Sequence, residues 1–451
     1  MIFPMVFSTK NAVLVLLFLV ASNVCAANAA AEDWLRFRGE NGSGLIAEKR
    51  NLPMKWDRES KENIKWAIDL PGPGHSSPII VGDRVLLTCW TGYGTGVEGE
   101  DDQAKLARHL LCYHRETGKE LWRRSVAAVL PEDRYEGMFA EHGYATHTPV
   151  SDGKHVFVFF GKSGVHAFEL ESGEPLWQQF VGNGLDPRRW GSAGSPILHK
   201  TKGDDSKQLV IVPAIAESTM LVALDAENGD VVWEQRAEGL ASTWGTPILV
   251  PVDETRTDLV MGVPYEIWGM NPDNGKLRWY ADGIDADSIS ASVVHHQGVI
   301  YLQGGRSGGT VAVRSGGKGQ LKGKDVLWQE NHRGRIASPV VSGKRLYWMN
   351  GGVISCLDTS TGDRIQQVRL RAPEGATDSG SSRDGGGSSR GGSRFGGGRR
   401  GGGFGADYGS PILVGEKIYV FNRKGLGYVV AANDELEQIG GGVLSDGGEF
   451  S

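Results

Sequence analysis

Short apolar runs separated by glycine-containing turns dominate the hydrophobic pattern of this chain. One phrase is written seven times: a small residue followed in most copies by proline, two aliphatic residues, a turn and an aliphatic strand. A spacing near 47 residues indicates a structural repeat, and the two long intervals each predict an insertion of about 25 residues. The copies begin at Ser77, Thr148, Ser195, Thr246, Ala291, Ser338 and Ser410, at intervals of 71, 47, 51, 45, 47 and 72 residues.

A second phrase follows most copies and consists of a turn that ends in glycine and a short strand that closes on tryptophan. Asn228-Gly229 before Trp233 is an example, and such a glycine supplies the positive φ that a tight hairpin requires. We interpret the recurring tryptophans as structural residues wedged between neighbouring units, because repeated apolar positions mostly serve packing. The positions are Trp66, Trp122, Trp177, Trp233, Trp279 and Trp328, of which Trp66 and Trp328 lack the preceding turn.

Each repeat therefore contains three or four short strands, and no helical period of useful length interrupts them. A repeat of 45–50 residues is the spacing of propeller blades, whereas a tandem of β-sandwiches would need about twice as many residues per unit. We predict a single all-β domain over residues 33–451, a β-propeller with seven visible repeats. Ile64–Leu70 has the pattern of a closing strand, and we favour an eight-bladed plan whose last blade is incomplete.

The first residues have the pattern of a secretory signal peptide, which we place at residues 1–29. Ala12–Ala21 is an uninterrupted apolar run, and small residues with A-x-A-like cleavage options follow it. The run is too short to span a bilayer, so we favour a signal peptide over a permanent anchor. Val24 before Cys25 argues against a lipoprotein. We expect a secreted or periplasmic protein without a membrane span after cleavage.

Composition narrows the classes of function. With 48 Lys and Arg against 54 Asp and Glu, the net charge of −6 argues against a nucleic-acid partner. Cys89, Cys112 and Cys356 form no CxxC pair, and we expect small buried strand residues rather than a zinc site. We place a Gly-rich and acidic insertion at about 91–108, and a disordered Gly/Arg/Ser-rich insertion at about 374–406.

Two motifs carry a resemblance to a known family. The phrase A-x-D-x-x-N-G-x-x-x-W at residues 223–233 resembles the quinoprotein, or PQQ-like, propeller repeat. The opening at residues 34–44, WLRFRGENGSG, resembles that of a large group of secreted bacterial proteins built from this repeat. The resemblance covers about residues 33–440 and extends to outer-membrane assembly factors of the BamB type and to quinoprotein alcohol dehydrogenases. It implies a fold that hosts both enzymes and scaffolds.

A quinoprotein dehydrogenase would imply a Ca²⁺ site of Glu, Asn and Asp oxygens, a catalytic Asp, a stacking Trp and often a vicinal disulfide. The sequence has no Cys-Cys pair and no loop with enough carboxylates for calcium, so we expect no catalytic residue, no metal and no cofactor. His142 and His147 have metal-ligand spacing without an identifiable third ligand, which favours a structural or surface role. PQQ with calcium is expected only under the alternative function, a quinone-dependent oxidoreductase.

The residues just before each inner strand should ring one mouth of the central channel. There they either bind a polar ligand or partner, or merely plug the channel. We expect Trp244 to face water on one side. The candidate residues are His75, His147, Trp190, Trp244, Arg335 and Tyr408, with Ser192 and Ser290 beside them.

We predict an exported, non-catalytic binding or assembly module of the periplasm or cell envelope. The expected partner is an envelope protein or a small polar ligand, bound at the channel mouth or the blade loops, and we expect a monomer. The alternative is a small-ligand sensor or a quinone-dependent oxidoreductase that uses the same mouth.

Overall fold

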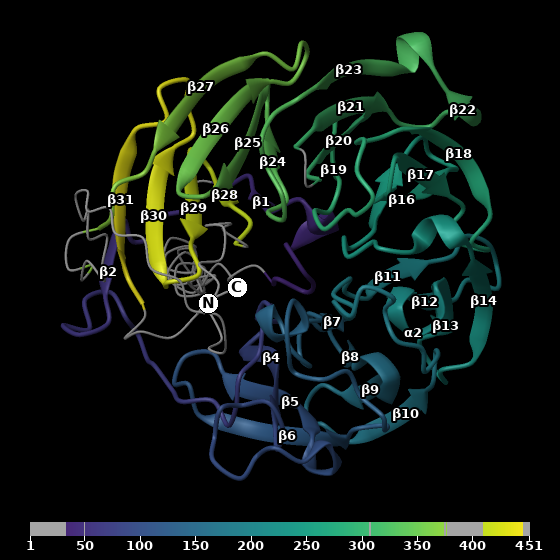
Figure 1. The fold of residues 1–451 in the computed structure, drawn as a ribbon, viewed down its shortest axis with the longest axis vertical. Coiled ribbons are helices and arrows are strands. Elements are labelled where there is room, and N and C mark those ends of the chain that lie inside the picture. The colour runs from purple at the N-terminus through teal and green to yellow at the C-terminus, as the bar shows by residue number, and fades with distance from the viewer. Residues whose placement is uncertain (1–32, 49, 306–307, 374–375, 377–408, 445–451) are drawn as a thin grey trace, which may run out of the picture.

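The computed structural model describes residues 33–48, 50–305, 308–373, 376 and 409–444. Seven sheets stand around a central axis, each built on four antiparallel strands (Figure 1). The sheets follow one another in chain order, so each repeat of the sequence forms one sheet. The all-β propeller expected from the repeat is therefore confirmed.

The first three sheets each run from the strand nearest the axis to the outermost strand. Sheet 1 contains β3 (Ile79–Val81), β4 (Arg84–Thr91), β5 (Ala107–His114) and β6 (Glu120–Ala127). Sheet 2 contains β7 (Val150–Ser151), β8 (His155–Phe159), β9 (Val165–Glu169) and β10 (Pro175–Gln179). Sheet 3 contains β11 (Ile197–Lys200), β12 (Gln208–Ala214), β13 (Met220–Asp225) and β14 (Val231–Arg236).

The next three sheets repeat this order with one exchange of a strand. Sheet 4 contains β15 (Ile248–Pro251), β16 (Thr257–Val263), β17 (Glu266–Met270), β18 (Leu277–Asp282) and, parallel to β18, β22 (Gly319–Leu321) from the following repeat. Sheet 5 contains β19 (Val294–His296), β20 (Val299–Gln303), β21 (Thr310–Arg314) and β23 (Val326–Glu330). Sheet 6 contains β24 (Val340–Ser342), β25 (Arg345–Asn350), β26 (Val353–Asp358) and β27 (Arg364–Arg369).

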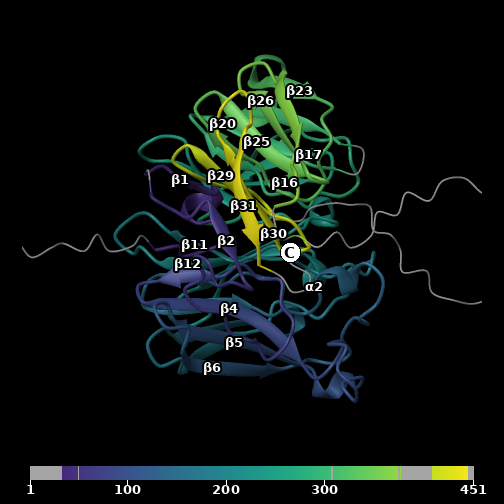
Figure 2. The ribbon, with the colours of Figure 1, turned by 90° about the vertical axis from the view of Figure 1, so that its left-hand side faces the viewer.

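Sheet 7 combines both ends of the described chain. Its own strands are β28 (Ile412–Val414), β29 (Lys417–Phe421), β30 (Leu426–Ala431) and β31 (Gln438–Val443). Two strands from the N-terminal part, β1 (Leu45–Ile46) and β2 (Lys55–Asp57), pair in parallel with β28 and β31 respectively, and Figure 2 shows β2 beside β31.

Helical turns are short and lie in the connections between strands. No helix in the described part of the chain is long and apolar enough to cross a membrane. The turns are η1 (Glu40–Gly42), η2 (Gln103–Lys105), η3 (Phe139–Glu141), η4 (Gly161–Ser163), α2 (Ile215–Ser218), η5 (Glu238–Leu240) and η6 (Gly323–Asp325).

The core lies between neighbouring sheets rather than at the axis. Alternate residues of a strand point to opposite faces, so one sheet contributes to two layers of core. Phe157 of sheet 2 packs in one cluster with Val210 and Val222 of sheet 3, for example. Cys112 and Cys356 are buried in such layers, and Cys89 is buried in a cluster of sheet 1. All three have free thiols, and burial raises the pKa of each to about 12.

A tryptophan and a glycine join most neighbouring sheets. The ring of Trp233 lies against Gly275 of the next hairpin, and its Nε1 donates to the oxygen of Pro272 at 3.0 Å. A Cβ on Gly275, which has a φ of +71°, would lie 2.6 Å from the ring. This position therefore requires glycine for its backbone and for its contact. The same arrangement joins Trp66 to Gly118, Trp122 to Gly173, Trp177 to Gly229 and Trp328 to Gly362.

Trp279 departs from this pattern. Its Nε1 donates to Oδ2 of Asp258 in its own sheet at 2.7 Å, and the side chain is fully buried. Asp258 is paired with Arg256 and Arg278, which compensates the buried carboxylate. The next repeat does not place a hairpin glycine against this ring, and its β22 covers the edge of β18 instead. Trp279 thus lacks the glycine contact and the carbonyl bond of the other tryptophans, although its ring packs in the cluster that contains residues of sheets 4 and 5.

The strand expected at Ile64–Leu70 is not formed, and β1 and β2 join sheet 7 in its place. The segment lies instead against sheet 1, where Trp66 donates to the oxygen of Arg115 at 2.8 Å. Trp66 contacts the hairpin of sheet 1 in the same way as Trp122 contacts the hairpin of sheet 2. The described residues form seven sheets, and residues 64–70 form no strand, so the eight-bladed plan with an incomplete last blade stays a prediction.

The two predicted insertions differ in how far the structure describes them. The insertion at about 91–108 lies between β4 and β5, where Leu106 packs in a cluster with Trp90, Phe139 and Tyr144. The insertion at about 374–406 lies outside the described residues except for residue 376, as does the predicted signal peptide.

Candidate functional site

Residues 33–46, here called the floor segment, cross one end of the central channel. Its backbone bonds to sheets 1, 2 and 7: Trp34 pairs with Ile80, and the oxygens of Leu35 and Gly44 accept from the N–H groups of Ser151 and Leu413. Its arginines reach sheets 4 and 6: Arg36 donates to the oxygen of Pro247 at 3.1 Å, and Arg38 to that of Pro339 at 2.6 Å. The floor segment thus binds five of the seven sheets.

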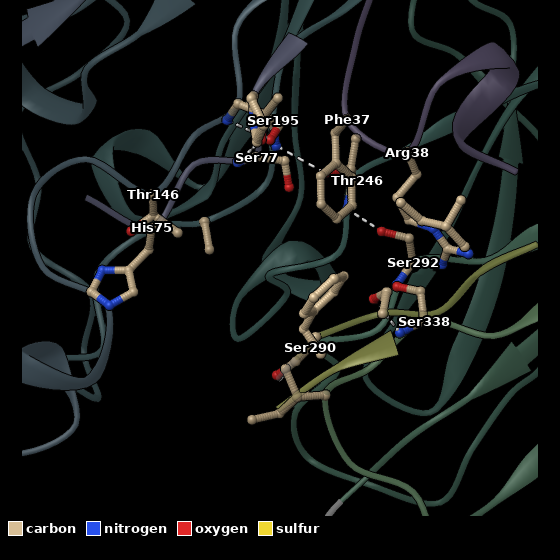
Figure 3. A pocket seen from close by; sticks show the side chains of 18 of the residues that line it. Phe37, Arg38, His75, Ser77, Thr146, Ser195, Thr246, Ser290, Ser292 and Ser338 are labelled. Carbon is tan, nitrogen blue, oxygen red and sulfur yellow. Dashed lines mark hydrogen bonds between the residues drawn. The ribbon is translucent and has the colours of Figure 1, made fainter. Parts of the chain in front are cut away.

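A ring of seven hydroxyl groups forms the wall above the floor segment. The backbone N–H of the residue in one sheet donates to the hydroxyl of the next, at 2.9–3.0 Å (Figure 3). This bond explains why the repeated phrase begins with serine or threonine. In the fifth copy the hydroxyl belongs to Ser292, one residue after Ala291. The members are Ser77, Thr148, Ser195, Thr246, Ser292, Ser338 and Ser410.

The floor segment and the ring enclose a cavity of about 720 Å³. Phe37 and Arg38 extend into its lining from the floor segment, and all seven hydroxyl residues line it (Figure 3). We call the end of the cavity opposite the floor segment the mouth. The residues that come shortly before the hydroxyl residue of each repeat lie there. The structure brings four of the predicted mouth residues to this one cavity, namely His75, Trp190, Trp244 and Arg335.

Trp190 and Trp244 form an aromatic pair at the mouth. Their ring centroids are 5.0 Å apart, with 34° between the planes. Trp244 also donates from Nε1 to the oxygen of Gly191 at 2.8 Å and is only 8% exposed. The expectation that Trp244 faces water on one side is therefore wrong, because Trp190 and the connection that carries it cover the ring.

His147 lies behind the mouth rather than in the cavity. It is 5% exposed and lines a separate cavity of about 30 Å³ with Ser192 and Glu217. Nε2 of His147 lies 3.0 Å from the Ser192 hydroxyl, which donates to Oε1 of Glu217 at 2.8 Å. Burial lowers the pKa of His147 to about 3 and raises that of Glu217 to about 7.

This chain of groups is not arranged for nucleophilic catalysis. The Ser192 hydroxyl donates to the Glu217 carboxylate rather than to His147, so His147 is not placed to remove the serine proton. The neighbouring His142 is also a positioning group: its Nε2 donates to the oxygen of Trp190, and burial lowers its pKa to about 4. His142 thereby holds the backbone of Trp190 at the mouth.

The two remaining predicted mouth residues are Arg335 and Tyr408. Arg335 is half-buried at the mouth, while Tyr408 lies outside the described residues. Sequence reasoning missed Arg38 and the hydroxyl ring. The serine or threonine at the start of each repeat was a visible signal for the ring, but nothing in the spacing indicated that residues 34–44 close the channel.

The residues present do not fit a quinone cofactor bound through calcium. Within the described residues no group of three or more His, Cys, Asp or Glu side chains is placed to hold a metal ion. Glu141 is the single carboxylate among the described cavity-lining residues, and it is paired with Arg423 at 2.5 Å. Calcium requires six to eight oxygen ligands, usually including several carboxylates.

Seven four-stranded antiparallel sheets, joined by glycine–tryptophan contacts around a lined channel, define a β-propeller of PQQ-like repeats. The profile of the family described as "Outer membrane protein assembly factor BamB" matches residues 96–213 and 190–437, and the chain belongs to this family.

Two curated relatives and one solved structure are similar to the chain. Polyvinylalcohol dehydrogenases from Sphingopyxis sp. (strain 113P3) and Pseudomonas sp. are 22% and 24% identical to it, over 45% and 48% of this chain. These matches span 39% and 46% of the relatives, less than half of their length. The quinohemoprotein alcohol dehydrogenase of Comamonas testosteroni shares the fold with a TM-score of 0.51 and 11% identity, covering 92% of this chain and 80% of that one.

Proposed function

We propose that this protein is an exported binding module of the cell envelope, which takes a ligand or a segment of a partner protein into the mouth of its channel and performs no chemistry on it. The observation that carries the proposal is the cavity of about 720 Å³, closed at the floor segment and lined by Trp190 and Trp244 at the mouth. Its volume falls in the range of ligand sites in proteins, about 300–1,000 Å³.

The mouth offers the contacts that binding sites use. Trp190 presents a half-buried ring, and Arg335 is half-buried with no ion pair among the described residues. Aromatic and arginine side chains are the residue types that most often dominate binding energy at interfaces. The position of Trp190 is held by the bond from His142 to its carbonyl, so little ordering of this residue is needed on binding.

The competing function is oxidation of an alcohol by a bound quinone, which the similarity to polyvinylalcohol dehydrogenases suggests. The cavity lacks the carboxylate ligands that calcium would require, as described above. The test is to add PQQ and calcium to the full chain and to follow dye reduction with polyvinyl alcohol and with simple alcohols. We expect no reduction above a heat-denatured sample, and turnover would overturn the non-catalytic assignment.

Binding at the mouth is tested by capture of partners from envelope extracts. The wild type is compared with Trp190→Ala and with Leu176→Ala, a control on the outer strand β10 whose side chain is 47% exposed. We expect the Trp190 variant to lose the captured component and the Leu176 variant to retain it. Equal capture by all three proteins would place binding elsewhere on the molecule.

A further inference from the structure

The charge of the cavity is opposite to the charge of the chain. The whole sequence carries a net charge of −6. Among the described residues that line the cavity, the charged side chains are Arg38, Arg50, Arg115, Arg335 and Glu141. Glu141 is already paired with Arg423 at 2.5 Å, and Arg50 is paired with Glu48 at 3.5 Å, so the positive charge of the lining comes from Arg38, Arg115 and Arg335. The cavity is therefore an electropositive site in an acidic protein.

Arg38 places a nearly uncompensated charge beneath the cavity. Its side chain is 4% exposed, and Nη2 donates to the oxygens of Ser43 and Pro339, while Nε and Nη1 are buried without a hydrogen-bond partner. No carboxylate in the described residues pairs with it. Burial lowers the pKa of Arg38 to about 9, which leaves the guanidinium charged at neutral pH. A buried cation is costly unless an anion compensates it.

The hydroxyl ring supplies donors in the same place. The oxygen of each hydroxyl from Thr148 to Ser410 already accepts a backbone N–H, so its own proton is available to donate into the cavity. Ser338 adjoins Pro339, whose carbonyl holds Arg38. The wall thus combines hydroxyl donors with positive charge, and this combination selects a ligand that brings acceptor oxygens and negative charge.

We propose that the cavity binds a small organic carboxylate on a flat ring body, with the carboxylate at the hydroxyl ring near Arg38 and the body extending towards Trp190 and Trp244. This inference rests on the proposed function and names the ligand class of the same site. Aromatic acids and sugar acids share this chemistry, because an aromatic ring and the C–H side of a pyranose can both pack on tryptophan and each carries a carboxylate for hydroxyl donors.

The experiment compares matched probes that differ in charge. Benzoate is titrated against benzamide, and glucuronate against glucose, with calorimetry and tryptophan fluorescence as readouts. We expect the carboxylate of at least one pair to bind about tenfold or more tightly than its neutral partner, and added salt to weaken it. The pair that responds distinguishes an aromatic acid from a sugar acid.

Two variants with matched controls locate the effect. Arg335→Gln should weaken carboxylate binding about tenfold, whereas Arg236→Gln on the exposed side of β14 should not change it. Arg38→Gln should weaken binding similarly. Its control is Arg36→Gln, because Arg36 is also a buried arginine of the floor segment, bonded to one carbonyl, but does not line the cavity. Arg335→Gln keeps the inference testable if the floor variants do not fold.

The failures of the two proposals can be told apart. Equal binding of charged and neutral probes would overturn the carboxylate inference and leave a binding module in place. If none of the four probes binds but a partner is captured in a way that depends on Trp190, the carboxylate inference is also overturned and the binding module is kept. If no probe binds and no partner is captured, the proposed function is overturned as well.

Discussion

The glycine–tryptophan contact between sheets leads to a quantitative prediction at Gly275. An alanine there requires the left-handed backbone at a φ of +71° and places a Cβ 2.6 Å from the Trp233 ring. The matched control is Gly298→Ala, where φ is +79° and nothing lies within 4 Å of the added Cβ. The control isolates the backbone cost, about 1–2 kcal/mol.

Gly275→Ala should cost about 1–3 kcal/mol more than the control, because the indole must move and its bond to the Pro272 oxygen is strained. Trp233→Ala alone should cost about 3–5 kcal/mol, as expected for a side chain that is 8% exposed. In the double variant the ring is gone, and Gly275→Ala should then cost no more than Gly298→Ala does.

Urea unfolding followed by far-UV circular dichroism measures each free energy of unfolding, and the coupling follows from the double-mutant cycle. If Gly275→Ala costs the same with and without the tryptophan, the ring and the glycine are not coupled. The account of how neighbouring sheets are joined would then be refuted.

Four further predictions concern the site. Ser195→Ala should cost about 1 kcal/mol in urea unfolding, because the buried N–H of Thr148 loses its acceptor. Trp244→Ala should cost about 3 kcal/mol, since the ring is buried, and a value below about 1 kcal/mol would contradict this placement. Burial lowers the pKa of His147 from 6.5 to about 3, so its contribution to stability is lost as the pH falls below 6.5, and His147→Asn should resist acid unfolding better than the wild type. Glu217 has the opposite sign: its pKa is raised from 4.5 to about 7, so stability is lost as the pH rises through 7, and Glu217→Gln should be the more stable protein in thermal melts at pH 8.

The repeat was predictable because sheet contacts recur at a fixed spacing. Serine or threonine before proline and glycine before tryptophan are local signals, and each places a residue at the same height in every sheet. Trp279 was not predictable in this way, because its partner Asp258 follows no repeated phrase. The strand expected at Ile64–Leu70 failed for a related reason: its apolar alternation fits a strand, but its neighbour is sheet 1 through Trp66 and not sheet 7.

The mouth was predictable in part, because the residues before each inner strand necessarily gather at one end of the channel. How deeply each residue at that end is buried was not predictable from the sequence. His147 lies one residue before Thr148 and is 5% exposed, whereas Trp190 lies five residues before Ser195 and is only half-buried. The role of Arg38 could not be read from the sequence, since its acceptor at Pro339 is 301 residues away.

The floor segment has a consequence for the order in which the molecule assembles. Its arginines bind carbonyl oxygens 211 and 301 positions later in the chain, and those acceptors stand in place only after sheets 4 and 6 have folded. Its backbone bonds to sheets 1 and 2 can form earlier, because Ile80 and Ser151 lie nearer in the chain. The channel is therefore fully closed at this end only after the later sheets have folded around the floor segment.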